Sequence, residues 1–164
     1  ELTVKNLIKH MSNRGAVVTE PTPEEVEDIY HTRVLLESYA IEFVVANMNS
    51  TSLKSIELYE IAFEKSLEEE NLRGIFQYNR LFHQAIFGVC GNKIVSEMID
   101  QLRNRSRIWF RYIRSSPQHR KKSVKDHLAI IECLRSKDSA KLKSLNKNHL
   151  TAGFKSYKEN MIII

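Results

Sequence analysis

The chain has 164 residues, of which 42% are hydrophobic and 27% charged, and its net charge is +5. These values are typical of a single globular domain with a substantial core. No apolar run approaches the ~18 residues of a membrane-spanning helix, no signal peptide is visible, and the small net charge alone does not indicate a polyanionic partner.

The first 21 residues predict a short β-hairpin. A turn at Asn13-Arg14-Gly15 is followed by the β-branched run 17–19, which is typical of a second hairpin strand, and residues 2–11 lead into the first strand. This segment is too short to be a complete domain. We therefore divide the chain into residues 1–21, an incomplete unit, and residues 22–164, a helical domain.

Six helices are predicted in residues 22–164. Thr22 is followed by Pro23 and, at the third helical position, by Glu25, which is a strong start signal, and this helix should run to about residue 46. Asn49, Gly91-Asn92, the segment SSPQ, and Asp138 or Ser139 mark further starts and ends. The other helices are expected at about 51–69, 72–89, 93–114, 119–135 and 139–161. The fold class is therefore all-α, an antiparallel bundle of about six helices preceded by a short β-hairpin.

The two cysteines, Cys90 and Cys133, are isolated from each other and form no CxxC pattern. Both stand in apolar runs, which favours a place in the core over a role as nucleophile. Their small number and their spacing indicate a reduced interior, and we expect a cytoplasmic protein.

Three histidines fall inside predicted helices beside apolar residues: His83, His127 and His149. Asn79 precedes His83 by four residues, so both side chains point the same way from one helix. A single helical histidine is more often a hydrogen-bonded core residue than a ligand. Three imidazoles and one oxygen, however, are a suitable ligand set for zinc or nickel inside a bundle. A metal site and a hydrogen-bonded polar core both remain open at this point.

Arginines are concentrated in residues 103–114, where their spacing of two and four prevents all of them from sharing one helix face. Some of them should therefore turn inward. Arg103 and Arg107 are four residues apart and share a face. The planar guanidinium group can bond both oxygens of a carboxylate, so an inward arginine is a candidate for binding an organic acid.

Four segments in combination resemble the GntR superfamily of bacterial transcription regulators: RGAVVTEPTPEEVEDIYHTRVLLESYAIE, NRLFHQAIFGVCGN, DHLAIIECLRSKD and NKNHL. The resemblance is to the FadR subfamily, with its C-terminal FCD domain, and covers essentially the whole chain. It implies that residues 22–164 form a helical effector-binding and dimerisation domain. It also implies that residues 1–21 are a remnant of the winged helix-turn-helix DNA-binding domain, with Arg14 and Gly15 at the wing tip.

Carried over to this sequence, the resemblance implies metal ligands at Asn79, His83, His127 and His149. The family usually has aspartate at the first position, so asparagine supplies an oxygen without the negative charge and a divalent ion should bind more weakly. The ion, zinc or nickel, would anchor the carboxylate of an effector. Arg33 should face the cavity, unless it forms an ion pair with Glu37, and Arg103 and Arg107 are further candidates for binding the carboxylate.

We therefore expect a homodimeric, non-enzymatic sensor that changes operator binding when a small carboxylate binds, with DNA contacted through the mostly missing N-terminal domain. Two other interpretations remain open. A small metal-dependent helical hydrolase or oxygenase would need a carboxylate base close to the histidines, and no paired carboxylates stand at helical spacing with them. A purely structural dimerisation bundle would use the histidines as buried hydrogen-bonding groups.

Overall fold

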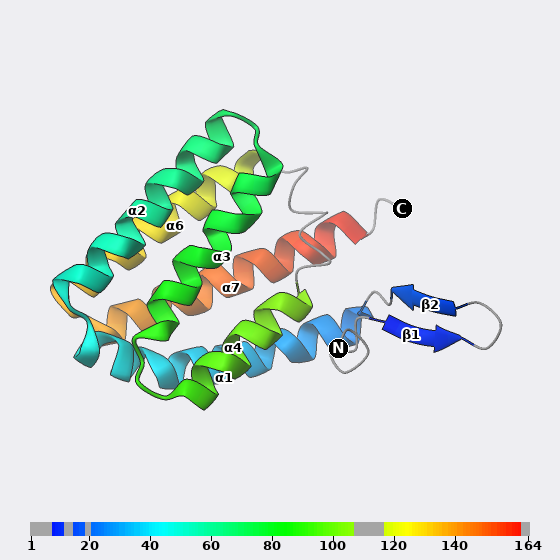
Figure 1. Cartoon of the computed structure of the whole chain (residues 1–164), viewed down its shortest axis with the longest axis horizontal. Helices are drawn as coiled ribbons and strands as arrows, with labels where there is room; N and C mark the ends of the chain where they lie inside the picture. Colours follow the sequence, from blue (N-terminus) through cyan, green and yellow to red (C-terminus); the bar gives the residue numbers. More distant parts are fainter. Residues whose placement is uncertain (1–7, 12–14, 19–20, 107–116, 162–164) are drawn as a thin grey trace.

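The computed structural model describes residues 8–11, 15–18, 21–106 and 117–161. Within these ranges the chain forms six α-helices and one two-stranded sheet (Figure 1). The predicted helical bundle is therefore confirmed. The helices are α1 (Pro23–Asn47), α2 (Ser50–Glu68), α3 (Leu72–Gly88), α4 (Lys93–Arg105), α6 (Pro117–Ser136) and α7 (Ser139–Met161).

Side-chain caps explain where the helices begin. Thr22 and Glu25 form a reciprocal capping box at the start of α1, with the Glu25 amide donating to Thr22 Oγ1 at 3.2 Å and the Thr22 amide donating to Glu25 Oε2 at 3.0 Å. Asparagine side chains accept backbone hydrogen bonds at the starts of the next three helices, and Asp138 does so before α7. The start signals predicted at Thr22, Asn49 and Asp138 are therefore confirmed, whereas Asn71 was not predicted as a cap.

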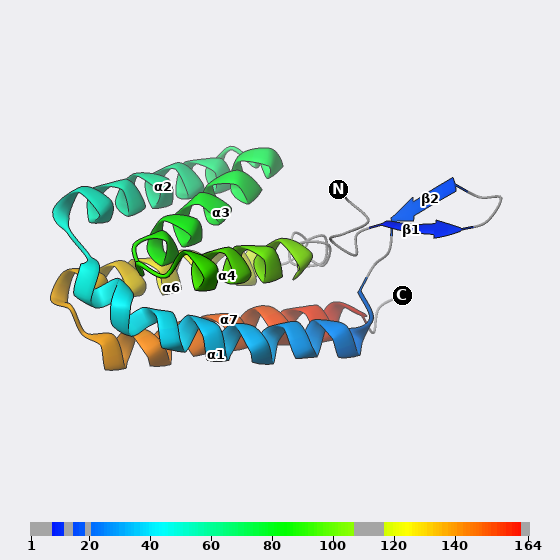
Figure 2. The same cartoon turned by 60° about the horizontal axis from the view of Figure 1, so that its bottom comes forward.

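The helices are arranged in pairs around one core. Helices α2 and α3 pack along each other, as do α1 and α7, and α6 contacts both pairs through α2 and α7 (Figures 1 and 2). Helix α4 lies against α1 and α3. The main core is built from side chains of all six helices, among them Ile41, Ile56, Phe82, Ile99 and Ile130. None of the described helices is long and apolar enough to cross a bilayer.

The fourth helix is shorter than the sequence prediction. It was expected to reach about residue 114, but α4 ends at Arg105. The backbone N–H of Ser106 bonds the carbonyl groups of Leu102 and Asn104, and its hydroxyl donates to the carbonyl of Arg103 at 2.9 Å. These bonds satisfy carbonyl groups that a helix end would otherwise leave free. The remaining predicted turns, including Arg107, lie outside the described residues.

Strands β1 (Ile8–Met11) and β2 (Gly15–Val18) form an antiparallel pair in which Met11 faces Gly15. They lie beyond the N-terminal end of α1, at one end of the molecule (Figure 1). Gly15 is the first residue of β2. Arg14, the other residue of the predicted tip, lies outside the described residues.

Candidate metal centre and adjoining pocket

Three helices bring His83, His127 and His149 together in the interior of the bundle. They come from α3, α6 and α7, and one nitrogen from each lies within 4.8 Å of the others. The ring centroids of each pair are 5.0 to 5.3 Å apart. His83 and His127 are fully buried, and His149 is nearly so. The three histidines singled out in the sequence therefore form one cluster.

Two carboxyl groups contact the Nδ1 atoms of two of these imidazoles. Glu60 Oε2 on α2 lies 2.6 Å from His127 Nδ1, and Asp126 Oδ2 lies 3.2 Å from His149 Nδ1. A carboxylate on Nδ1 fixes the ring orientation and leaves Nε2 as the free ligand atom, which is the usual arrangement around protein metal sites. The Phe82 ring stacks on His127 with centroids 4.2 Å apart and further restrains that ring.

The donor atoms of the cluster fit a divalent transition metal. Neither ring nitrogen of His83, nor Nε2 of His127, has a hydrogen-bond partner among the described residues, although all three atoms are buried. Such orphaned polar atoms are costly in a folded core unless a further group satisfies them. Burial lowers the pKa of His83 well below its usual value, that of His127 to about 3 and that of His149 to about 4. The imidazoles are therefore neutral at physiological pH, as metal ligands must be.

Asn79, the fourth predicted ligand, lies one helical turn before His83 and is half-buried. It lines a small pocket of about 20 Å³ together with Arg33 and Arg103. Asn79 therefore shares α3 with His83 and a pocket with the arginines of α1 and α4.

Arg33 forms the ion pair that was the alternative to a role in the cavity. Its Nε and Nη2 both lie 2.9 Å from Oε1 of Glu37, and Asn146 Nδ2 on α7 donates to Glu37 Oε2 at 2.9 Å. Burial raises the pKa of Glu37, but the two guanidinium charges and these hydrogen bonds outweigh it and hold the pKa below the usual value. Arg33 is thus occupied by Glu37.

Arg103 is less completely paired. Its Nη1 is 3.6 Å from Glu37 Oε1, too far for a hydrogen bond, and this buried atom has no hydrogen-bond partner among the described residues. Burial, and next the charge of Arg33, lowers the pKa of Arg103 to about 9, so it remains largely protonated at neutral pH. Two guanidinium groups therefore share one carboxylate, which leaves an excess positive charge beside the cluster.

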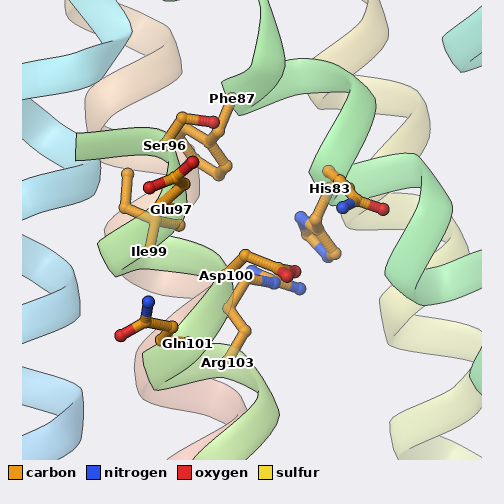
Figure 3. Close-up of a pocket in the computed structure, with 9 residues that line it drawn as sticks. His83, Phe87, Ser96, Glu97, Ile99, Asp100, Gln101 and Arg103 are labelled. Carbon is orange, nitrogen blue, oxygen red and sulfur yellow. The ribbon is translucent and has the colours of Figure 1, made fainter. Parts of the chain in front are cut away.

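A pocket of roughly 180 Å³ opens between α3 and α4 and connects these features. His83 and Arg103 both line it, and Figure 3 shows Arg103 and Asp100 extending from α4 toward His83 on α3. Its other lining residues are Gln84, Phe87, Ser96, Glu97, Ile99 and Gln101. Of the three clustered histidines, only His83 reaches this pocket.

The two carboxylates that bond the histidines were not predicted from the sequence. Asp126, which precedes His127 in the sequence, contacts His149 and Lys122. Glu60 could have been found from its position, because it is a charged residue between Ile56 and Phe63 on the buried stripe of α2. Its partner His127 is 67 residues away in the sequence. Arg107, proposed beside Arg103, lies outside the described residues.

Comparison with known proteins identifies a family model and two similar transcription regulators. A family model described as the FCD domain matches residues 28–152. The chain is 24% identical over 153 residues to the HTH-type transcriptional regulator YdhC of Bacillus subtilis (strain 168), covering 90% of this chain and 65% of YdhC. It is also 24% identical over 123 residues to the regulator McbR of Escherichia coli (strain K12), covering 74% of this chain and 56% of McbR.

Solved structures share the fold. E. coli McbR/YncC has a TM-score of 0.86 at 20% identity, covering 96% of this chain and 80% of that structure. The metal-free FCD domain of TM0439 has a TM-score of 0.72 at 14% identity, covering 89% of this chain and all of that structure. At these identities the likeness shows the fold alone. The chain spans less than two thirds of the length of the two curated relatives, 65% and 56%.

Proposed function

Because this chain belongs to the FCD domain family, we propose that it is the ligand-sensing domain of a bacterial transcription regulator of the GntR superfamily, FadR subfamily. In this proposal a small carboxylate binds in the pocket between α3 and α4 and changes the affinity of the whole protein for its operator. The observation that carries the proposal is the position of His83, which belongs both to the histidine cluster and to the pocket that Arg103 lines.

His83, His127 and His149 would hold a divalent metal ion, with the side-chain oxygen of Asn79 as a fourth ligand. When bound, the ion supplies a positive centre that anchors a carboxylate. Three neutral imidazoles favour zinc or nickel over ions that prefer oxygen ligands. Asparagine adds no negative charge, so the net charge of the site stays positive and favours an anionic effector.

Arg103 is the residue best suited to receive the effector carboxylate. It lines the pocket, and its buried Nη1 lacks a hydrogen-bond partner in the described part of the chain. A carboxylate would satisfy that atom and offset the excess charge of the arginine pair. Arg33 contributes indirectly in this proposal, since it draws Glu37 away from Arg103.

The partners of the whole protein follow from the same proposal. Residues 1–21 would be the wing of a DNA-binding domain, with Arg14 and Gly15 near the operator, and the protein would act in the cytoplasm. We also propose a homodimer. Its supporting observation is a set of exposed apolar residues, named here the α1/α4 face, that consists of Leu35, Tyr39, Phe43, Ile94 and Met98.

The test is metal analysis of the purified chain, as isolated and after dialysis against zinc or nickel, with thermal unfolding in parallel. We expect about one equivalent per chain and a raised unfolding temperature. His83→Ala should lose both effects. His31→Ala is the matched control, because His31 is exposed on α1 and should retain both.

A result without metal in the unmodified chain, even after dialysis, would contradict the sensing mechanism and favour a purely structural bundle. Metal binding followed by steady turnover of a carboxylic ester or amide would instead favour a metal-dependent hydrolase. The carboxylates nearest the cluster, Glu60 and Asp126, are already bonded to ligand histidines, which argues against their use as a general base.

A further inference from the structure

The pocket between α3 and α4 carries opposite charges on its walls. Arg103 supplies a positive charge, whereas Asp100 and Glu97 on the same helix supply negative ones. Asp100 precedes Arg103 by three residues, so their side chains leave α4 on the same side. Figure 3 shows both extending toward His83. A ligand that reached Arg103 would therefore also meet the Asp100 carboxylate.

Asp100 is not paired with Arg103 in the described part of the chain. No ion pair joins the two side chains in the described part of the chain, and the one hydrogen bond of Asp100 there is to Asn104, whose Nδ2 donates to Oδ2 at 3.1 Å. The other oxygen of Asp100 is thus available to a ligand. Glu97 is less suited to binding, because its side chain is more than half exposed and it faces Lys93 at 3.8 Å.

We propose that the effector is a small zwitterion of the α-amino acid type, whose carboxylate binds at His83 and Arg103 and whose ammonium group binds Asp100. This inference rests on the proposed sensing function and deepens it by naming the class of effector. Neighbouring charges of opposite sign on α4 match a molecule in which a carboxylate and an ammonium group are attached to the same carbon.

The same charges select against other acids. A second carboxylate, as in a small dicarboxylic acid, would approach Asp100 and be repelled by it in a partly buried pocket. A hydroxy acid could donate one hydrogen bond to Asp100 but would bring no positive charge. A pocket of roughly 180 Å³ is small, so it suits a compact ligand.

The experiment is calorimetric titration of the metal-loaded protein with three probes: L-alanine, L-lactate and succinate. Alanine and lactate have nearly the same size and differ in the group that meets Asp100. We expect alanine to bind about tenfold or more tightly than lactate, the effect of one charge-assisted hydrogen bond, and succinate to bind most weakly. Metal retention is measured after each titration, because free amino acids also chelate metal ions.

Two variants assign the preference to Asp100. Asp100→Asn should reduce alanine binding to the level of lactate and leave lactate binding nearly unchanged. Glu97→Gln, on the exposed rim of the same pocket, should keep the preference for alanine. Both replacements are close in size to the original side chains, and Asp100 is only half-buried, so the fold should persist.

Lactate or succinate binding as tightly as alanine would overturn this inference while leaving the sensing of a carboxylate intact. Equal loss of alanine and lactate in Asp100→Asn would also overturn it, since Asp100 would then merely shape the pocket. If none of the three probes binds the metal-loaded protein, the proposed sensing function fails, and the zwitterion inference fails with it.

Discussion

At the scale of single residues, Glu60 is a buried carboxyl group on the inward face of α2, where apolar side chains are usual. Its Oε2 contacts His127 Nδ1, while its buried Oε1 lacks a hydrogen-bond partner in the described ranges. Burial raises the pKa of Glu60 to about 8. A group that is costly to bury in this way is explained if it orients His127 toward a metal ion.

Glu60→Gln should therefore weaken metal binding. Glutamine keeps the size of the side chain but removes the carboxyl group that orients His127, and loss of such a partner typically costs about 10- to 100-fold in metal affinity. Calorimetric titration with zinc or nickel checks this expectation. The control is Glu57→Gln, at a position on α2 like Glu60. It removes a hydrogen-bond partner of Arg135 on α6 and should bind metal like the unmodified protein. Unchanged affinity in Glu60→Gln would mean that the carboxyl group has no part in metal binding.

The three histidines could be singled out from the sequence, because an imidazole among apolar helix positions is a local signal, whereas Arg33 was identified only through the family resemblance. What those groups contact could not be predicted. Glu60 meets His127 only through the packing of α2 on α6, and Asn146 meets Glu37 only through the packing of α7 on α1. The ion pair of Arg33 with Glu37, by contrast, follows from four-residue spacing and was one of two stated alternatives.

At the scale of helices, Glu37 joins three of them. It stands on α1, accepts hydrogen bonds from Arg33 on the same helix and from Asn146 on α7, and lies 3.6 Å from Arg103 on α4. Its side chain is completely buried. Removal of the negative charge would leave two buried guanidinium groups without a counter-charge.

Glu37→Gln should lower the free energy of unfolding by about 3–5 kcal/mol, the usual cost of breaking a buried ion pair from one side. Urea denaturation measures the change. The control is Glu42→Gln on the same helix, which removes the exposed ion pair with Lys143 on α7 and should change the free energy of unfolding much less. Equal effects of the two substitutions would contradict a special role for the buried network.

The histidine cluster joins α3, α6 and α7 and makes the stability of the metal-free protein depend on pH. The pKa of His127 falls to about 3 and that of His149 to about 4, against 6.5 for an ordinary histidine, because burial disfavours their charged forms. Below about 6.5 the unfolded chain binds protons that the folded chain does not. Stability should therefore decrease as the pH falls from about 6.5 toward about 4, and these groups should have no effect above that window.

Urea denaturation of metal-free protein at several pH values tests this dependence. His149→Gln should give a shallower decrease, because glutamine does not titrate. A decrease as steep in His149→Gln as in the unmodified protein would contradict the lowered pKa of His149.

Helix starts were easier to predict than helix ends. A helix start is determined by residues close together in the sequence, as in the capping box of Thr22 and Glu25, which are three residues apart. The end of α4 could not be predicted in this way, because Arg105 and Ser106 are followed by residues with no strong stop signal before Ser115-Ser116-Pro117. The end of α4 is marked instead by the bonds that Ser106 makes to the preceding carbonyl groups.

At the scale of the whole molecule, the large exposed apolar side chains of the described residues fall in two groups. One is the α1/α4 face, in which four-residue spacing aligns Leu35, Tyr39 and Phe43 along α1. Ile94 and Met98 are aligned in the same way along α4, which packs against α1. The other consists of Leu58 and Ile61 on α2 and Leu128 on α6. Tyr39 and Phe43 are both more than 40% exposed, so they are available to a partner.

The α1/α4 face is the larger of the two, and such a face favours contact with a second copy of the chain. In a two-fold dimer each substitution acts twice, so one charge placed at the centre of the face should suffice to separate the subunits. We expect Tyr39→Glu to shift the protein from dimer to monomer in analytical ultracentrifugation without loss of helix content, because Tyr39 is half exposed and not needed by the core.

Ile61→Glu is the matched control on α2, at a similarly exposed position, and should leave the dimer intact. Dissociation by Ile61→Glu with an intact Tyr39→Glu dimer would place the contact on α2 instead. A monomeric unmodified chain would remove the homodimer from the proposed function.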